Sequence, residues 1–381
     1  MAATTRVGSL KKHFRRLKDP RVVGRTKHLL FEIVALAICA VIGNCDDWAD
    51  VVVFVEEREK WFRTFLKLPG GLPCRHTYQR VFDALDPRAL AGCCLAWLHE
   101  VAGLVGGVEH IAIDGKTLRG SAGSPLGALH LVSAWATGMQ LTLGQVAVDG
   151  KSNEITAIPQ LLGLLDLKGA LVTIDAIGCQ KAIAKQIVDS GGDYVLVAKG
   201  NQERLLADIQ ETVGQALDDQ LEAGLTRQST MIDKGHGRIE QRHTVIVTDL
   251  TRIRDLKLWP KLTTVGMCYR ERTVGDKTST EVCYFIGSRR MGARRYAQAL
   301  RNHWGIENNQ HWQLDVSFHE DASRIGSRNG AANFALFRKL ALNLLKRNPR
   351  EESIARKRKR AALDTAFLAE TLLGANKVEE V

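Results

Sequence analysis

The sequence Ile111-Ala112-Ile113-Asp114-Gly115-Lys116-Thr117 begins the part of the chain that decides the fold. Its apolar residues form a short run that ends on an acid, and Leu171-Val172-Thr173-Ile174-Asp175 has the same form further along. Short apolar runs bounded by turn residues are typical of buried strands. We therefore expect two buried strands, each with an aspartate at its end.

Strand and helix patterns alternate around these two runs. The expected order is three strands, a helix, a strand, a helix and a strand, at residues 111–114, 129–136, 140–148, 153–165, 171–175, 180–190 and 194–198. This alternation indicates an α/β domain, and its order is that of a ribonuclease-H-like core with a mixed sheet. In such a sheet the ends of the first and fourth strands lie side by side. Asp114 and Asp175 are therefore expected to be neighbours.

The composition favours a nucleic-acid partner. The 381 residues include 53 lysines and arginines against 42 aspartates and glutamates, which gives a net charge of +11. Such a surplus favours a polyanion such as DNA. The most apolar run, residues 29–43, contains Glu32 and is too short to span a membrane. No apolar core accompanies the basic N-terminal residues, as a signal peptide requires, so we expect a cytosolic protein without membrane contact.

A third acid, Glu307, lies in the helical stretch His303-Trp304-Gly305-Ile306-Glu307-Asn308. Two strand-end carboxylates and one helix carboxylate can converge on a pair of divalent cations. Mg²⁺ prefers carboxylate oxygens, and two such ions about 4 Å apart support in-line displacement at a phosphodiester. The alternative is that each aspartate caps a helix or starts a turn. The strand order favours the metal site, with Asp114 as the bridging ligand.

The rest of the chain divides into three predicted regions. Residues 1–105 are expected to be an all-helical N-terminal domain that binds DNA or acts as a scaffold, or else a cap that contacts only the next domain. Residues 106–345 are the expected catalytic domain, interrupted by a β-rich insertion at about 203–290. Residues 346–381 are a basic C-terminal tail, expected to be a mobile helix or disordered. The helices expected outside the α/β core are 29–43, 47–68, 77–85, 87–105, 294–314 and 333–345, and the strands of the insertion are 229–232, 241–248, 262–270 and 281–286.

The residues after Asp114 invite a second interpretation. The run from Asp114 to Thr117 is not a phosphate-binding loop, because His110 stands where that motif requires glycine. Lys116 and Arg119 are instead expected to neutralise a DNA phosphate beside the metal ions, or to lie in a solvated turn.

A zinc site is the alternative use of the helix around Glu307. His303, Glu307 and His311 recur every four residues on one helical face. The motif His-Glu-x-x-His is absent, however, and none of the eight cysteines forms a Cys-x-x-Cys pair. We expect mostly buried thiols. Trp304 and Trp312 are expected to pack in the core rather than to stack on a base.

Several ordered motifs together resemble the DDE superfamily of insertion-sequence transposases, in particular the H-repeat-associated group. The resemblance covers nearly the whole chain. The motifs that carry it are Asp19-Pro20-Arg21, Thr77-x-x-Arg80-Val81-Phe82, Leu85-Asp86-Pro87, residues 112–120, Lys151-Ser152-Asn153-Glu154-Ile155, Ile174-Asp175-Ala176 with Cys179-Gln180, Lys199-Gly200-Asn201-Gln202, residues 234–240 with Arg242, and His303-Trp304-x-Ile306-Glu307-Asn308 with residues 311–316 and 318–321.

The resemblance implies a catalytic and metal-binding triad of Asp114, Asp175 and Glu307, with Mg²⁺ as cofactor and Mn²⁺ able to substitute. It implies DNA cleavage and strand transfer by a bacterial, nucleoid-associated protein. The partner is double-stranded DNA at element ends and target, bound by a homodimer, with no small-molecule substrate. The expected DNA contacts are Lys116, Arg119, Lys199, Lys234, Arg238, Arg301 and His303.

One departure from the superfamily concerns the signature Y-x-x-R-x-x-x-E-x-x-x-x-x-x-K around the third acid. Its tyrosine, arginine and lysine places hold Leu300, His303 and Leu314. Arg301 or His303 is expected to replace the arginine beside the cut phosphate. The altered places keep two alternatives open. One is a catalytically degenerate or domesticated DNA-binding protein, and the other is a structure-selective nuclease on the same core.

Overall fold

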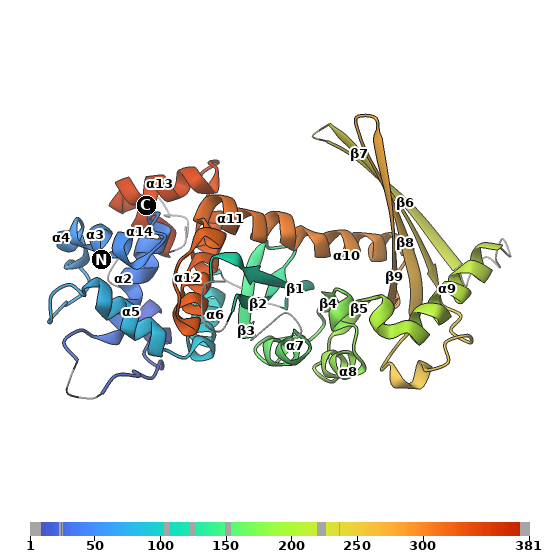
Figure 1. Ribbon diagram of the computed structural model, residues 1–381, viewed down its shortest axis with the longest axis horizontal. Helices are drawn as coiled ribbons and strands as arrows, with labels where there is room; N and C mark the ends of the chain where they lie inside the picture. Colours follow the sequence, from blue (N-terminus) through green and yellow to red (C-terminus); the bar gives the residue numbers. More distant parts are fainter. Residues whose placement is uncertain are drawn as a thin grey trace, which may run out of the picture.

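The computed structural model is an elongated molecule with three parts in a row (Figure 1). A helical body built from the N-terminal and C-terminal helices lies at one end. A sheet with helices on both faces lies in the middle, and a four-stranded arm projects from the other end. The structure describes residues 9–22, 24, 26–102, 107–121, 127–148, 154–218, 226–235 and 237–373.

One nine-stranded sheet runs through the middle and the arm in the order β3-β2-β1-β4-β5-β9-β8-β7-β6. Its strands are β1 (His110–Leu118), β2 (Leu129–Ala136), β3 (Leu141–Val148), β4 (Leu171–Ile174), β5 (Asp193–Ala198), β6 (Thr226–Gly235), β7 (Arg238–Val247), β8 (Thr264–Val274) and β9 (Lys277–Gly287). β1, β4 and β5 are parallel, and the other neighbours pair antiparallel. The predicted α/β fold with a ribonuclease-H-like mixed sheet is confirmed.

Helices cover both faces of the sheet and make up the helical body. They are α2 (Leu30–Ile42), α3 (Trp48–Glu56), α4 (Glu59–Phe62), α5 (Arg75–Ala84), α6 (Pro87–Ala102), α7 (Glu154–Leu162), α8 (Lys181–Asp189), α9 (Glu203–Asp218), α10 (Ala293–Ile306), α11 (Trp312–Phe318), α12 (Arg328–Arg347), α13 (Ile354–Leu363) and α14 (Thr365–Leu373). α7 and α8 lie on one face of the sheet and α10 on the other (Figure 1).

Residue alternation along β1 decides which face each side chain meets. Ile111 and Ile113 belong to the core that contains α7 and α8, whereas Ala112 packs with Ile306 of α10. Successive side chains of a strand point to opposite faces. Asp114 therefore shares the α10 face with Ala112.

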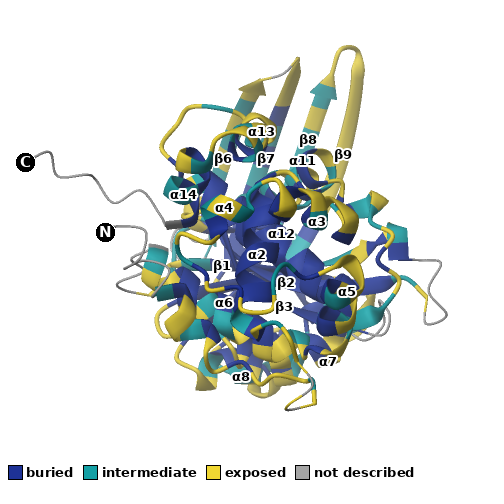
Figure 2. Cartoon of the chain, turned by 90° about the vertical axis from the view of Figure 1, so that its left-hand side faces the viewer, coloured by how far each residue is buried: buried dark blue, intermediate teal, exposed yellow. Residues whose placement is uncertain are grey.

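The insertion extends the core sheet. β9 pairs with β5 from Val195↔Gly287 to Ala198↔Tyr284, so the four inserted strands continue the sheet edge. Beyond this base, the hairpins β6–β7 and β8–β9 run out as an arm whose surface is largely exposed (Figure 2). The predicted strands occur in the expected order, and α9 precedes them.

The helical body forms around α12. This helix contacts α2, α5, α6, α13 and α14, and its residues from Gly330 to Leu345 are all buried. In Figure 2, α2 and α12 lie dark blue inside a ring of other helices. N-terminal and C-terminal helices thus share one apolar core, so this body is assembled from two distant parts of the sequence.

Two expectations for this body are wrong. The helix predicted at 47–68 is interrupted and forms α3 and α4, with Glu57 and Arg58 between them. The tail that we expected to be a mobile helix or disordered does form helices, α13 and α14, but they are packed into the body, and Arg358 in its basic block is fully buried. Packing against α2 and α12 orders this charged segment.

Two expectations from the composition agree with the structure. Six of the eight cysteines are buried, Cys93 is half-buried and Cys74 is exposed, which confirms mostly buried thiols. Within the described ranges, no helix has the length and apolar character to cross a membrane.

Candidate active site

Asp114 and Asp175 are brought together by the register of two parallel strands. The pairing of β1 with β4 runs from His110↔Leu171 to Ile113↔Ile174, so each aspartate follows the last pair. The expectation that Asp114 ends its strand is wrong, because β1 continues to Leu118 along β2. Asp175 does follow β4 directly, and its side chain accepts a hydrogen bond from the backbone N–H of Ile177.

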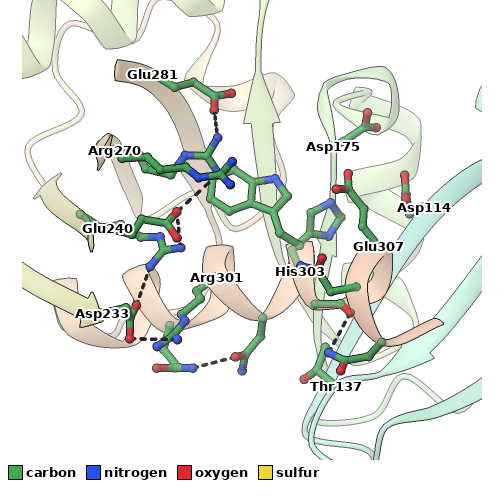
Figure 3. Close-up of a pocket in the computed structure, with 18 of the residues that line it drawn as sticks. Asp114, Thr137, Asp175, Asp233, Glu240, Arg270, Glu281, Arg301, His303 and Glu307 are labelled. Atoms are coloured by element: carbon green, nitrogen blue, oxygen red, sulfur yellow. Dashed lines mark hydrogen bonds and ion pairs between the residues drawn. The ribbon is translucent and has the colours of Figure 1, made fainter. Parts of the chain in front are cut away.

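Glu307 stands at a change of helical geometry. α10 passes without a break into a π-helical turn, Glu307–His311, which is followed by α11. Single π-turns are rare inside helices and are frequent at functional sites. The turn places Glu307 on a cleft of about 960 Å³ that Asp114 and Asp175 also line. Figure 3 shows the three carboxylates together on one side of this cleft.

The electrostatics of Asp114 favour a cation nearby. Burial and the negative charges of Asp175, Glu307 and Glu154 together raise the pKa of Asp114 to about 7, although a hydrogen bond from the backbone N–H of Gly115 acts in the opposite direction. Clustered carboxylates of this kind disfavour one another's ionised form until a positive charge offsets them. Their oxygens are also the ligands that Mg²⁺ and Mn²⁺ prefer.

The three acids share the cleft without forming a closed ligand cage. Among the residues that the structure describes, no three His, Cys, Asp or Glu side chains are grouped so that they could hold a metal ion. The residues nevertheless fit a divalent cation by ligand chemistry and excess negative charge. The zinc alternative gains no support, since His303 and His311 form no such group with Glu307.

Of the two histidines of that alternative, His303 is buried and His311 is half-buried. His303 Nδ1 lies 3.1 Å from Thr173 Oγ1, and burial lowers its pKa to about 4. His311 Nδ1 lies 3.6 Å from Asp114 Oδ2, and burial lowers its pKa to about 3. Both rings are therefore uncharged near neutral pH. His303 and Arg301 both line the cleft, so the expectation that one of them contacts a phosphate near the cut stays a prediction, and of the two Arg301 carries the positive charge near neutral pH.

Lys116, which was expected to contact a DNA phosphate, is engaged by acidic side chains. Its ammonium group forms ion pairs with Asp315, with Glu320 at 3.0 Å and with Asp321 at 3.8 Å. Glu320 is fully buried, so this cluster ties β1 to the segment after α11. Arg119, by contrast, is 85% exposed and lies 3.6 Å from Asp321.

The remaining predicted cations do line the cleft. They are Lys199, Lys234, Arg238 and Arg301. Arg301 projects from α10 and forms an ion pair with Asp233 of the arm at 2.9 Å. Parts of two predicted motifs lie outside the described residues. These are His236 of the motif at 234–240 and residues 151–153 of the motif at 151–155.

The arm adds basic residues that the sequence analysis did not assign to the site. Arg270 and Arg272 line the same cleft, as does Arg242, which was named only as part of a motif. Arg242 donates to Asp233 at 2.7 Å, and Arg270 pairs with Glu281 (Figure 3). The spacing of these arginines could have identified them. Residues an even number of positions apart share a face of a strand, as do Arg270 and Arg272 on β8 and Arg238 and Arg242 on β7.

The two tryptophans differ in environment. Trp304 lines the cleft, where the Arg270 guanidinium lies 4.8 Å from the centre of its ring. Trp312 is 54% exposed, so the expectation that it packs in the core is wrong. Both rings are placed on or near the helix that carries Glu307.

Comparison with known proteins agrees with this geometry. The family model described as "Transposase DDE domain" matches residues 106–344, and "DDE_Tnp_1-associated" matches residues 11–98. The chain is 38% identical over 370 residues to "Putative transposase YncI" of Escherichia coli O157:H7, covering 95% of this chain and 94% of that protein. It is 35% identical over 373 residues to "H repeat-associated putative transposase YhhI" of Escherichia coli K12, covering 96% and 98%.

Proposed function

The chain belongs to the DDE transposase family, and from this membership we propose that it cuts DNA at the ends of an insertion sequence and joins them to a target. Asp114, Asp175 and Glu307 are the proposed catalytic residues. The observation that carries the proposal is that these three acids line one cleft together with basic residues of α10 and the arm.

The proposed reaction is a pair of phosphodiester displacements. Water attacks a phosphorus atom at the element end, the bond to the 3′-oxygen breaks, and a free 3′-hydroxyl remains. That hydroxyl then attacks a target phosphodiester, which releases a second 3′-hydroxyl as the new bond forms. Asp114, Asp175 and Glu307 would hold Mg²⁺ or Mn²⁺, which supplies activation of the attacking oxygen and stabilisation of the leaving oxygen.

The side chains around the triad would bind and orient the DNA backbone. Lys199 lies at the end of β5, Arg301 lies nearly two turns before Glu307, and both line the cleft, so we expect them to neutralise phosphate charge near the cut. Lys234 and Arg238 on the arm extend this basic lining. Joining two element ends to one target requires two protomers, so we propose a homodimer on DNA, acting at the nucleoid in the bacterial cytoplasm.

The experiment that tests this function is a Mg²⁺-dependent cleavage and joining assay on DNA that carries the element ends. Triad variants are expected to lose both reactions while still shifting the DNA in a gel. Cleavage without any joining to a second duplex would instead assign the chain to the structure-selective nucleases.

A second candidate function is a DNA-binding protein without catalysis. The observation that favours it is that two of the three altered signature places, Leu300 and Leu314, are buried in the apolar core. They therefore cannot hold DNA as a tyrosine and a lysine would. A gel shift with no cleavage by the wild-type protein, in either Mg²⁺ or Mn²⁺, would establish this alternative.

Replacing Arg301 by alanine is expected to weaken DNA binding in a salt-dependent way. Each phosphate contact contributes about 0.9 to the slope of log affinity against log salt, so the loss of one contact should lower that slope by about 1. The measurement is the dissociation constant of the wild-type protein and the variant at several salt concentrations. Lys185→Ala is the matched control, because Lys185 is exposed on α8, on the other face of the sheet. Equal slopes for all three proteins would contradict the proposed contact.

A further inference from the structure

A buried pair of side chains presses against the backbone directly after Asp114. A Cβ atom added to Gly115 would lie 2.5 Å from Glu154 Oε1 and 2.5 Å from His130 Nε2. Glu154 begins α7 and His130 lies on β2, and both are buried, with 5% and 2% of their surface exposed. Only glycine leaves room for this pair at position 115.

The pair is fixed on both sides by β1 and β2. His130 Nε2 lies 2.6 Å from Glu154 Oε1. The other ring nitrogen, Nδ1, shares a hydrogen bond of 2.9 Å with Thr117 Oγ1, and Thr117 and His130 are direct partners in the β1–β2 register. Thr117, His130 and Glu154 therefore form a row of contacting side chains. The row begins at Thr117 of β1, and its far end lies against β1 at Gly115.

This row lies behind the candidate catalytic acid. Asp114 projects towards α10 and the cleft. Because side chains alternate along a strand, a side chain at the next position, Gly115, would point to the α7 face. From Asp114 onwards β1 has no partner on its β4 side, because the β1–β4 pairing ends at Ile113. Glu154 and His130 thus contact the part of β1 that pairs with β2 but no longer pairs with β4.

We propose that Glu154 and His130 are positioning residues for Asp114. They hold the backbone at Gly115 in place, and so fix the direction in which the Asp114 carboxylate enters the cleft. This inference rests on the proposed function, in which Asp114 is a metal ligand. Groups that orient a metal-binding side chain without touching the metal are known to change metal affinity or activity by about 10- to 100-fold when they are replaced.

The first test compares Gly115→Ala with Gly144→Ala. The neighbours of Gly115 are side-chain ends, so the alanine methyl can be accommodated if the His130–Glu154 pair moves. Gly144 is a buried glycine of β3 in the same sheet, and its added Cβ would meet Leu161 at an ordinary 3.5 Å. Gly115→Ala is expected to cut about 10- to 100-fold more slowly than wild type, and Gly144→Ala to cut normally. Equal losses in the two variants would overturn the proposal.

The second test replaces Glu154 itself. Glu154→Ala is expected to slow cleavage about 10- to 100-fold and to raise by a similar factor the Mn²⁺ concentration at half-maximal thermal stabilisation, measured on the full chain without DNA. DNA affinity is expected to stay within about twofold, since the pair lies on the face away from the cleft. Glu154→Gln keeps a side chain of the same size against Gly115 and His130, so it is expected to recover most of the rate.

A double-mutant cycle separates positioning from a general loss of stability. If Gly115→Ala acts through Glu154, adding it to Glu154→Ala should cause no further loss, whereas independent effects would multiply. Multiplying effects, or wild-type rate and Mn²⁺ response in Glu154→Ala, would refute the positioning role. If Asp114→Asn also cut like wild type, the proposed function itself would fail. Loss of cleavage in Asp114→Asn alone would leave that function standing and reject only this inference.

Discussion

Replacing Asp114 by asparagine, Asp175 by asparagine or Glu307 by glutamine is expected to lower the rate of DNA cleavage by about 1000-fold. Each change keeps the size of the side chain and removes the charge that would hold a divalent cation. The cation's stabilisation of the transition state is worth several kcal/mol, and each 1.4 kcal/mol corresponds to about tenfold in rate. The measurement is single-turnover cleavage of DNA bearing the element ends, in Mg²⁺ and in Mn²⁺.

The control for these variants is Asp189→Asn. Asp189 is an exposed acid at the end of α8, paired with Lys185 of the same helix, and its loss should leave cleavage unchanged. A second measurement separates catalysis from folding. Asp114 is half-buried beside two other acids of the cleft, so Asp114→Asn is expected to raise the melting temperature of the metal-free protein. Wild-type cleavage by any triad variant would remove that residue from the proposed site.

Replacing Arg358 by alanine is expected to destabilise the whole helical body. The Arg358 side chain has no exposed surface and lies 2.8 Å from Asp46. Its guanidinium also donates to the carbonyl oxygens of Ser317, Val41 and Cys45, and it lies 4.1 Å from the ring centre of Phe318. Asp46 is half-buried and keeps its contact with His319 at 2.8 Å. The expected loss, about 3 kcal/mol, therefore comes mainly from the buried carbonyl oxygens that lose this donor and from the lost packing on Phe318.

The matched control lies next to it in the sequence. Lys359 belongs to the same basic block of α13 and is exposed, so Lys359→Ala should leave the free energy of unfolding within about 0.5 kcal/mol of wild type. Chemical denaturation measures the free energy of unfolding of the two variants, and a gel shift measures their DNA affinity. If Arg358→Ala lowered only DNA affinity and left stability unchanged, the segment would act as a DNA-gripping tail after all.

The sequence was most informative where its pattern is local. Alternation and short apolar runs at Ile111–Ile113 and Leu171–Ile174 predicted buried strands, and both are strands. The order of the elements then gave the neighbouring positions of Asp114 and Asp175, because parallel strands joined by helices pair in few ways. The boundary at Asp114 was missed, since the pairing of β1 with β2 continues past the acid.

Charge was the poorest guide to a residue's role. Lys116 follows the candidate acid by two residues, yet it is held by Glu320 and its neighbours rather than facing the cleft. Arg270 and Arg272 do line the cleft and were not singled out. In the sequence, a lysine or arginine that contacts DNA cannot be distinguished from one that pairs with a buried acid. The difference depends on which acid lies opposite, and that is set by contacts between distant segments.

The sequence by itself therefore determined the α/β class, the order of the core elements and the three acids, because strand and helix periodicities are properties of neighbouring residues. Only the tertiary structure decided that the C-terminal helices complete the N-terminal body, that the inserted strands lengthen the core sheet, and that Glu154 and His130 contact the backbone after Asp114. The physical reason is that burial and ion pairing join residues far apart in the chain. Whether Arg358 is a surface charge or a buried anchor depends on Asp46 and on α11, which no local pattern places beside it.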